Sequence, residues 1–320
     1  MEYFHKPVLL KETINILDPK PGKVYVDATL GGSGHFNAIV EAAGKKGLFI
    51  GIDRDKDAIT NAVKKFSGSC ADVRFIHDNY INLINIINNM GLKGIDGIVF
   101  DLGVSSFQLD EGSRGFSYMH DSPLDMRMDK TSGITAEDVV NKIDLKELRN
   151  IIRKYGEEPW AGRIANFICA KRKLKKIETT GQLAEIIKEA IPARARRRGH
   201  HPAKRTFQAI RIYVNDELSI LGQSIKNAVD ILNPAGRICV ISFHSLEDKI
   251  VKSSLKELAQ GCTCPKDFPI CTCGKEKKIN IITRKPIYPT VVETEKNPRS
   301  RSAKLRAAEK LAVLKRRRSE

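Results

Sequence analysis

The sequence lacks any long apolar run: its longest apolar stretches, such as "GLFIGI" and "RICVISF", have the length of a strand. A membrane span needs roughly 20 consecutive apolar residues, so none is expected. The N-terminus, "MEYFHKPVLLKE", places charges among its apolar residues, which argues against a secretory signal. Because 41% of the 320 residues are hydrophobic, the chain can still bury cores and is not a disordered tail. We expect a cytoplasmic globular protein of about two domains.

Acidic residues are scarce relative to basic ones: 38 Asp and Glu against 55 Lys and Arg give a net charge of +17. The basic residues cluster in "KRKLKK" (171–176), in "ARARRRGHHPAKR" (193–205) and in the tail from about residue 297. A single charge run is often only a solvated surface. Three separated clusters favour nucleic acid as the partner.

The first hundred residues alternate strand-like and helix-like segments. Apolar, β-branched runs over 23–30, 47–55, 73–80 and 94–106 are separated by segments with helical spacing. This alternation predicts an α/β fold with a doubly wound, Rossmann-like parallel sheet. A further buried strand is expected over 237–245. The strand-like segment 279–293 contains two prolines, which suits an edge strand or a final hairpin.

The alternation stops after Gln108. Residues 109–130 have no period and predict a long functional loop, and three helical patterns follow near 143–155, 164–168 and 180–191. Apolar residues spaced by three or four from 207 to 232 then predict one long helix, which "NPAG" ends. We therefore predict a discontinuous sheet domain with a basic tail and an inserted all-helical domain, over residues 1–108 with 206–320 and over 109–205 respectively.

A glycine turn follows the first predicted strand. Asp27 ends that strand, and Gly31, Gly32 and Gly34 come next, where the backbone can approach a ligand and a helix N-terminus presents free N–H groups. The dinucleotide fingerprint needs a third glycine where Asn37 stands. A nicotinamide-dependent dehydrogenase, one alternative for such a sheet, is therefore disfavoured.

Carboxylates end the second and fourth predicted strands. Asp53 lies 19 residues beyond Gly34, where an acid can accept hydrogen bonds from ribose hydroxyls. Its other interpretation is as the cap of the next helix, a role that Asp55 could fill. S-adenosylmethionine suits this pattern better than a dinucleotide, since it has no pyrophosphate and carries a sulfonium and an amino-acid group. Asp101 ends the fourth strand, and Tyr80, after the third, would either cover adenine or pack in the core.

The resemblance to a known family rests on eight motifs in order: "HKPVLLKE", "DATLGGSGH", "DLGVSS", "GFSYMHDSPLDMRMD", "HPAKRTFQAIRIYVNDEL", "VISFHSLED", "TRKPIYPT" and "NPRSRSAKLRAAE". Over nearly its whole length the chain resembles the bacterial 16S rRNA cytosine-N4 methyltransferases, the RsmH (MraW) family. The resemblance implies a class I S-adenosylmethionine-dependent methyltransferase sheet with an inserted helical domain. It also implies N4-methylation of one cytosine, position 1402 in conventional numbering, in the decoding region of 16S rRNA within the 30S subunit.

The resemblance further implies a set of cofactor contacts: Ser33, Gly34, His35, Asp53, Tyr80, Asp101 and Gln108. The lone pair of cytosine N4 is delocalised into the ring, so an acceptor should hold the amino proton during transfer. The Pro-Pro-aromatic loop of many amino-group methyltransferases is missing from "DLGVSS". The open candidates for contacts to the amino group, and so for catalysis, are Asp101, Ser105, Ser106, Asn215 and His244.

His244 follows a buried strand, and a structural role, at a helix start or in packing, is favoured over a catalytic one. For the RNA, Arg194, Arg196, Arg197, Arg198 and Arg205 suit phosphate oxygens. The segment "GFSYMHDSPLDMRMD" (115–129) of the 109–130 loop is predicted to be flexible and to close over an extruded base. A non-catalytic RNA-binding ribosome-assembly factor with a vestigial cofactor pocket remains the alternative. The presence of Gly34, Asp53 and Asp101 argues against the loss of cofactor binding that this alternative requires.

Four of the seven cysteines lie within twelve residues, as C-x-C-P-x5-C-x-C: Cys262, Cys264, Cys271 and Cys273. Disulfides are uncommon in the cytosol, so a structural zinc ion is one interpretation. Against it, C-x-C is tighter than the usual C-x₂₋₄-C ligand spacing. Cys70, Cys169 and Cys239 are isolated and are expected to be small core residues.

Overall fold

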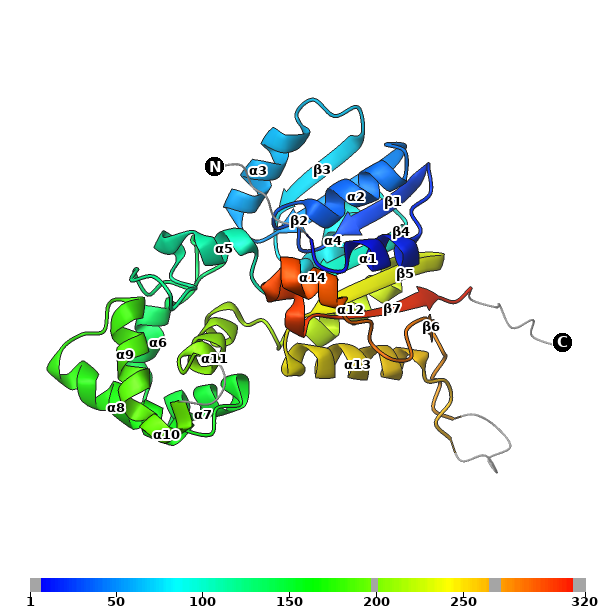
Figure 1. Cartoon of the computed structure of the whole chain (residues 1–320). Helices are drawn as coiled ribbons and strands as arrows, with labels where there is room; N and C mark the ends of the chain where they lie inside the picture. The colour runs from blue at the N-terminus through cyan, green and yellow to red at the C-terminus, as the bar shows by residue number, and fades with distance from the viewer. Residues whose placement is uncertain (1–6, 197–200, 265–271, 313–320) are drawn as a thin grey trace. The chain divides into compact units, whose positions relative to one another are not determined.

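The computed structural model describes residues 7–196, 201–264 and 272–312 (Figure 1). The chain forms two compact units. The sheet unit comprises Met1–Gly103 and Leu218–Glu320, and the helical unit comprises Val104–Glu217. In the described parts of the chain, none of the helices combines the length and the apolar character that crossing a bilayer requires.

The sheet unit contains seven strands in the order β3-β2-β1-β4-β5-β7-β6. The first five in chain order pair in parallel, as predicted: β1 (Lys23–Asp27), β2 (Gly47–Asp53), β3 (Asp72–His77), β4 (Ile95–Asp101) and β5 (Leu232–Ser242). From β1 the chain builds outward first through β2 and β3, then through β4 on the other side. This reversal makes the carboxyl ends of β1 and β4 the usual ligand position in an open α/β sheet.

Helices cover both faces of the sheet (Figure 1). Neighbouring residues of a strand point to opposite faces, so Val26 joins one core while Tyr25 joins the other. The helices of the first core are α4 (Leu83–Asn89), α12 (Leu221–Ile231) and α13 (Ser245–Ala259). Those of the second are α1 (Leu10–Leu17), α2 (Gly34–Ala42) and α3 (Lys56–Phe66). The doubly wound prediction is therefore confirmed.

The helical unit contains the three helices expected from the sequence: α7 (Leu145–Gly156), α8 (Ala161–Leu174) and α9 (Thr180–Ala190). Five shorter or flanking elements complete it: α5 (Ser106–Asp110), η2 (Gly112–Arg114), α6 (Ala136–Lys142), α10 (Ala193–Arg196) and α11 (Lys204–Asn215). Leu148, Ile164 and Leu183 bring α7, α8 and α9 to a single apolar core.

The single long helix predicted over 207–232 is wrong. The chain instead forms α11 and α12, and Asp216 ends α11 in the left-handed conformation with φ +49°. The Glu217 carboxylate turns back onto the Arg211 guanidinium, with two N–O distances of 2.9 Å. The apolar spacing continues in phase across the break, and for this reason periodicity did not reveal it.

The basic tail predicted from about residue 297 forms regular structure up to Lys310, and residues 313–320 lie outside the described residues. After α14 (Val291–Lys296) and η3 (Pro298–Ser302), β7 (Lys304–Lys310) pairs antiparallel with β5 and with the edge strand β6 (Ile279–Ile281). The Arg306 guanidinium is buried and donates to both carboxylate oxygens of Asp248, at 2.7 and 3.2 Å. This cation therefore stabilises the sheet unit and is not available to phosphate.

Candidate functional site

Three carboxylates meet where β1, β2 and β4 end. Asp27, Asp53 and Asp101 are the last residues of these strands, at the point where the strand order reverses. Burial raises the pKa of Asp27 to about 7; the positive charge of His35 opposes this shift, and the neighbouring Asp101 and Asp53 charges add to it. Three carboxylates beside the glycine turn suit a ligand that carries positive charge or several hydrogen-bond donors.

The glycine turn leads directly into α2. Gly31 and Ser33 both adopt left-handed conformations, with φ of +46° and +58°. The Ser33 N–H donates to the Leu30 carbonyl at 2.6 Å, which closes the turn. Ser33 is the N-cap of α2 but makes no side-chain cap bond. The first backbone N–H groups of α2, which have no partner inside the helix, can therefore receive an anionic group such as a carboxylate.

Asp53 links the glycine turn to the end of β2. Its carboxylate accepts hydrogen bonds from the Gly31 N–H and from the Asp55 N–H, both at 2.8 Å. Asp55, and not Asp53, caps α3 by accepting from the Asp57 N–H. A carboxylate has about four lone-pair positions, so Asp53 retains capacity for ribose hydroxyls. Burial is the main cause that raises the pKa of Asp53.

His35 lies between the N-terminal segment and Asp101. Its Nδ1 is 3.3 Å from Asp101 Oδ2, and its Nε2 is 3.0 Å from the Val8 carbonyl oxygen. Both partners can only accept, so the ring donates from both nitrogens as an imidazolium. Burial opposes this charge, but the contacts with Asp101, the charge of Asp27 and the Val8 carbonyl raise the pKa of His35 above its usual value.

The second oxygen of Asp101 fits an amino group. Asp101 Oδ1 is buried and has no hydrogen-bond partner in the described structure. A buried carboxylate oxygen without a donor is costly, which is typical of a position where a ligand donor completes the site. The residues present therefore fit S-adenosylmethionine, because this edge of the sheet combines N–H donors at the start of α2 with carboxylate acceptors at Asp101 and Asp53.

Tyr80 follows β3 and begins η1 (Tyr80–Asn82). Its ring packs edge-on against Phe100, with centroids 5.6 Å apart, and is only partly buried. The structure thus brings Ser33, Gly34, His35, Asp53, Tyr80 and Asp101 to the carboxyl edge of one sheet.

The remaining predicted residue of the cofactor set, Gln108, belongs to the helical unit. Its side-chain oxygen accepts from the Ser105 N–H at 3.0 Å, and Ser105 Oγ accepts from the Gln108 N–H at 3.2 Å. The two residues form a capping box at the start of α5, of which Ser106 is the first residue. The side chains of Ser105 and Gln108 therefore each accept a hydrogen bond from a backbone N–H group at the start of α5.

The other two candidates for the amino proton also make structural contacts. Asn215 is buried; its oxygen accepts from the Met128 N–H at 2.8 Å, and its Nδ2 donates to the carbonyls of Met126 and Arg211 at 2.7 and 2.9 Å. His244 is the N-cap of α13 and shares a capping box with Glu247. The interpretation of His244 as a helix-start residue is confirmed.

The loop of residues 109–130 is anchored over its second half. The buried Arg114 donates through Nη2 to the carbonyls of Arg127 and Met128, at 3.1 and 2.9 Å. Together with the contacts of Asn215, these bonds fix the 126–128 backbone, so the predicted flexibility does not describe this part. Nearer the tip, Tyr118 stacks on His201, with ring centroids 4.5 Å apart.

The structure describes three of the five arginines that are predicted to bind phosphate. Arg194 and Arg196 lie on α10, and Arg205 lies on α11, exposed, with Nη1 donating to the Glu157 carbonyl at 3.2 Å. Arg197 and Arg198 lie outside the described residues. In the 171–176 cluster, two exposed lysines pair with carboxylates, Lys171 with Glu189 and Lys176 with Glu137. Exposed pairs of this kind contribute little free energy, so they can exchange for phosphate contacts.

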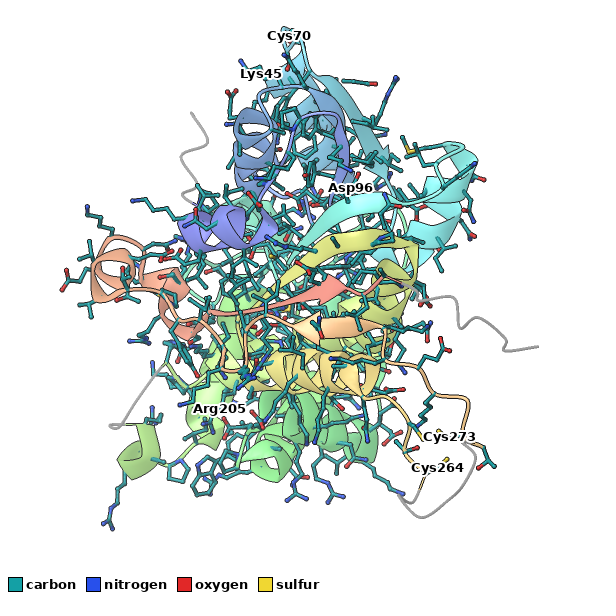
Figure 2. All side chains as sticks on the ribbon, turned by 90° about the vertical axis from the view of Figure 1, so that its right-hand side faces the viewer. Lys45, Cys70, Asp96, Arg205, Cys264 and Cys273 are labelled. Carbon is teal, nitrogen blue, oxygen red and sulfur yellow. The ribbon has the colours of Figure 1, made fainter. Side chains whose placement is uncertain are left out.

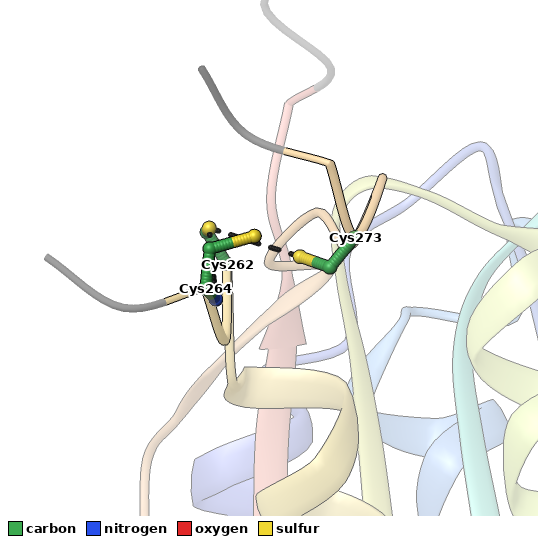
Figure 3. Close-up of side chains that lie close together, drawn as sticks. All are labelled: Cys262, Cys264 and Cys273. Carbon is green, nitrogen blue, oxygen red and sulfur yellow. Dashed lines mark hydrogen bonds between the residues drawn. The ribbon is translucent and has the colours of Figure 1, made fainter. Parts of the chain in front are cut away.

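Three of the four clustered cysteines converge (Figure 3). The Sγ atoms of Cys262, Cys264 and Cys273 all lie within 4.8 Å of one another. They come from the segment between α13 and β6, whereas Cys70 lies far away in the sheet unit (Figure 2). Cys271 lies outside the described residues. Cys70 is exposed, Cys169 is partly buried and Cys239 is buried, so the prediction of three core cysteines is correct for Cys239 and wrong for Cys70.

Seven strands in this order, with an antiparallel β7 and carboxylates at the ends of β1, β2 and β4, define a Rossmann-like S-adenosylmethionine-dependent methyltransferase sheet with an inserted helical region. Residues 2–311 match the MraW methylase family along almost the whole chain. The chain belongs to this family.

Curated relatives are similar over their whole length. The chain is 55% identical to "Ribosomal RNA small subunit methyltransferase H" of Halothermothrix orenii over 96% of its own length and 98% of the relative's. It is 55% identical to the protein of the same name from Clostridioides difficile, over 97% and 100%. The crystal structure of an rRNA methylase from Streptococcus thermophilus superposes with a TM-score of 0.42 at 11% identity, covering 97% of this chain and 100% of that one.

Sequence reasoning missed two groups at this site. The Thr29 hydroxyl accepts from the Asp101 N–H at 2.6 Å, and the Val8 carbonyl holds the His35 ring. Both residues lie inside motifs that carried the resemblance, "DATLGGSGH" and "HKPVLLKE". A backbone carbonyl has no sequence signature of its own, so position in a motif was the available signal.

Proposed function

We propose that this protein transfers a methyl group from S-adenosylmethionine to N4 of one cytosine in the decoding region of 16S rRNA, in the small ribosomal subunit and in the cytoplasm. The observation that carries the proposal is the family match over residues 2–311, with full-length relatives named ribosomal RNA small subunit methyltransferase H. The acidic edge of the sheet supports the choice of cofactor.

Bound S-adenosylmethionine supplies an electrophilic methyl group on a sulfonium. In the proposed site the N–H groups at the start of α2 hold its carboxylate, Asp101 Oδ1 accepts from its amino group, and Asp53 accepts from its ribose. Tyr80 covers the adenine with its ring face. These contacts fix the direction of the methyl group, and alignment of the nucleophile with it supplies much of the rate enhancement.

We propose that the helical unit binds the RNA backbone. Arg194, Arg196, Arg197, Arg198 and Arg205 provide forked donors that match phosphate oxygens, and the 171–176 cluster adds further charge. The candidates for the acceptor of the amino proton are Asp101, Asn215 and His244, and each also makes a structural contact: Asp101 with His35, Asn215 with the anchored loop and His244 with the start of α13.

The function is tested by mapping methylated cytosines in 16S rRNA from cells that lack the protein and from cells complemented with it. Loss and recovery of one N4-methyl mark is the expected result. A non-catalytic assembly factor would leave the mark unchanged while altering the amount of 30S particles. A radiolabelled methyl-transfer assay on purified particles then separates direct from indirect loss.

We also propose that Cys262, Cys264, Cys271 and Cys273 hold one structural zinc ion. A tetrahedral site with Zn–S bonds of about 2.3 Å places its sulfurs about 3.8 Å apart. The Sγ atoms of Cys262 and Cys273 are 3.7 Å apart, which supports this geometry.

Protein purified under reducing conditions, without added metal or chelator, should contain close to one zinc per chain by elemental analysis. A Cys271→Ser, Cys273→Ser variant should lose the metal, since two thiolate ligands are removed. Cys70→Ser is the matched control, because Cys70 is a free exposed thiol elsewhere in the sheet unit, and it should retain the zinc. Metal-free parent protein with normal stability and activity would exclude the site.

A further inference from the structure

The N-terminal segment of residues 7–9 contacts the start of α2. A Cβ added at Gly34 would lie 2.8 Å from Pro7 Cγ, so the Pro7 ring packs against the backbone of α2 at a position that only a glycine allows. The next residue, Val8, accepts the hydrogen bond from His35 Nε2. The position of this segment therefore sets the position of the His35 ring.

Leu9 holds this segment in a strained conformation. It has φ +54° and ψ +34°, the left-handed region that a leucine rarely adopts, and its side chain is wholly buried. Such a conformation persists only where the surroundings fix it. Its carbonyl accepts from the Thr13 N–H at 2.9 Å, and its N–H donates to Glu293 Oε1 at 2.7 Å.

Glu293 comes from α14, 284 residues away in the sequence. Its own backbone N–H donates to the Thr290 hydroxyl, which caps α14. The preceding loop is tied to β7 by two backbone hydrogen bonds between Ile287 and Leu305, of 3.0 and 2.9 Å. The carboxylate therefore reaches Leu9 from a fixed support within the same sheet unit.

We propose that Glu293 is a positioning residue for the cofactor site. Through Leu9 and Val8 it holds the His35 ring against Asp101, and so keeps Asp101 Oδ1 directed toward the amino group of S-adenosylmethionine. This inference rests on the proposed cofactor site. It gives α14 an indirect role in cofactor binding, because Glu293 acts through Leu9 and Val8 and not by touching the cofactor.

The experiment compares the full-length parent with three substitutions of one residue. Glu293→Ala removes the acceptor, and Glu293→Asp keeps the charge but is one methylene too short to reach Leu9. Glu293→Gln keeps an acceptor oxygen at full length. Glu295→Ala is the matched control, because Glu295 is an exposed acid on the same helix. Affinity for S-adenosylhomocysteine is measured by calorimetry, thermal midpoint by calorimetric scan, and His35 titration by NMR of histidine-labelled protein.

The titration reports on the groups that face His35, which are Asp101 from β4, Asp27 from β1 and the Val8 carbonyl. Glu293→Ala and Glu293→Asp should weaken S-adenosylhomocysteine binding by about tenfold, the effect of losing one charge-assisted hydrogen bond. They should also lower the pKa of His35, as the ring loses the Val8 carbonyl that helps to hold it charged. Glu293→Gln should stay within about threefold of the parent in affinity, since its amide oxygen still accepts from Leu9.

A lower thermal midpoint with unchanged affinity and unchanged His35 titration would overturn the proposal, because it would make Glu293 merely structural. So would an equal effect of Glu295→Ala. If Glu293→Ala does not fold, the contrast between the Asp and Gln variants decides the matter. Failure of the parent to bind S-adenosylhomocysteine would refute the proposed cofactor site instead. The His35 titration, which needs no cofactor, would then decide the Glu293–Leu9–Val8–His35 linkage by itself.

Discussion

Replacing Asp53 with alanine should weaken S-adenosylmethionine binding by about 1.5–3 kcal/mol, or roughly 10- to 150-fold, the range for a lost charge-assisted hydrogen bond. The expectation rests on the position of Asp53 at the end of β2 and on its bond to Gly31, which joins the carboxylate to the glycine turn. The substitution removes the ribose acceptor and one anchor of the turn together.

Calorimetric titration measures this effect, and the thermal midpoint of the same variant shows how much of it comes from a loosened turn. Asp72→Ala is the matched control: it removes the same charge from the other end of a neighbouring strand, where Asp72 pairs with Arg74. Unchanged cofactor affinity in Asp53→Ala would remove this residue from the site.

Methylation should be efficient on assembled 30S subunits and poor on a short single-stranded oligonucleotide, because the basic clusters are far larger than a mononucleotide needs. A surface that neutralises several phosphates makes RNA affinity fall steeply with salt, by a log–log slope of about −0.7 to −0.9 for each phosphate contacted. Between low and physiological salt, binding should therefore change by orders of magnitude.

Replacing Arg196, Arg197 and Arg198 with alanine should flatten that slope by about two to three units and weaken RNA binding, while S-adenosylmethionine affinity stays unchanged. The control is the triple replacement of Lys20, Lys45 and Lys46, which are exposed near the amino ends of β1 and β2 (Figure 2 labels Lys45). It removes the same charge from the edge opposite Asp53. Equal rates on a free cytidine nucleotide and on 30S particles, without salt dependence, would contradict the proposal.

The pattern of apolar residues along the sequence was sufficient to predict the elements whose burial depends on their own residues. The strands that end at Asp27, Asp53 and Asp101 are apolar and β-branched, and helical spacing lies between them, so the parallel half of the sheet could be predicted. Because parallel strands end at one edge, the same pattern predicted that these acids would meet. The resemblance added Ser33, His35 and Gln108, which no periodicity singles out.

Contacts between distant segments were decided only by the tertiary structure. The segment 304–310 reads as a charged tail, yet it inserts between β5 and β6, where Asp248 neutralises Arg306. The break at Asp216 left the apolar spacing intact and so gave no local signal.

The residues that hold the cofactor site in place also depend on contacts between distant segments. His35 is held by a backbone carbonyl at Val8, and Leu9 by a carboxylate 284 residues away. The sequence by itself determined which parallel strands form and where their acids lie, because burial of such a strand is a property of consecutive residues. The pairing of β7, the break after α11 and the Glu293–Leu9 bond required the folded chain, because each depends on which distant groups meet in space.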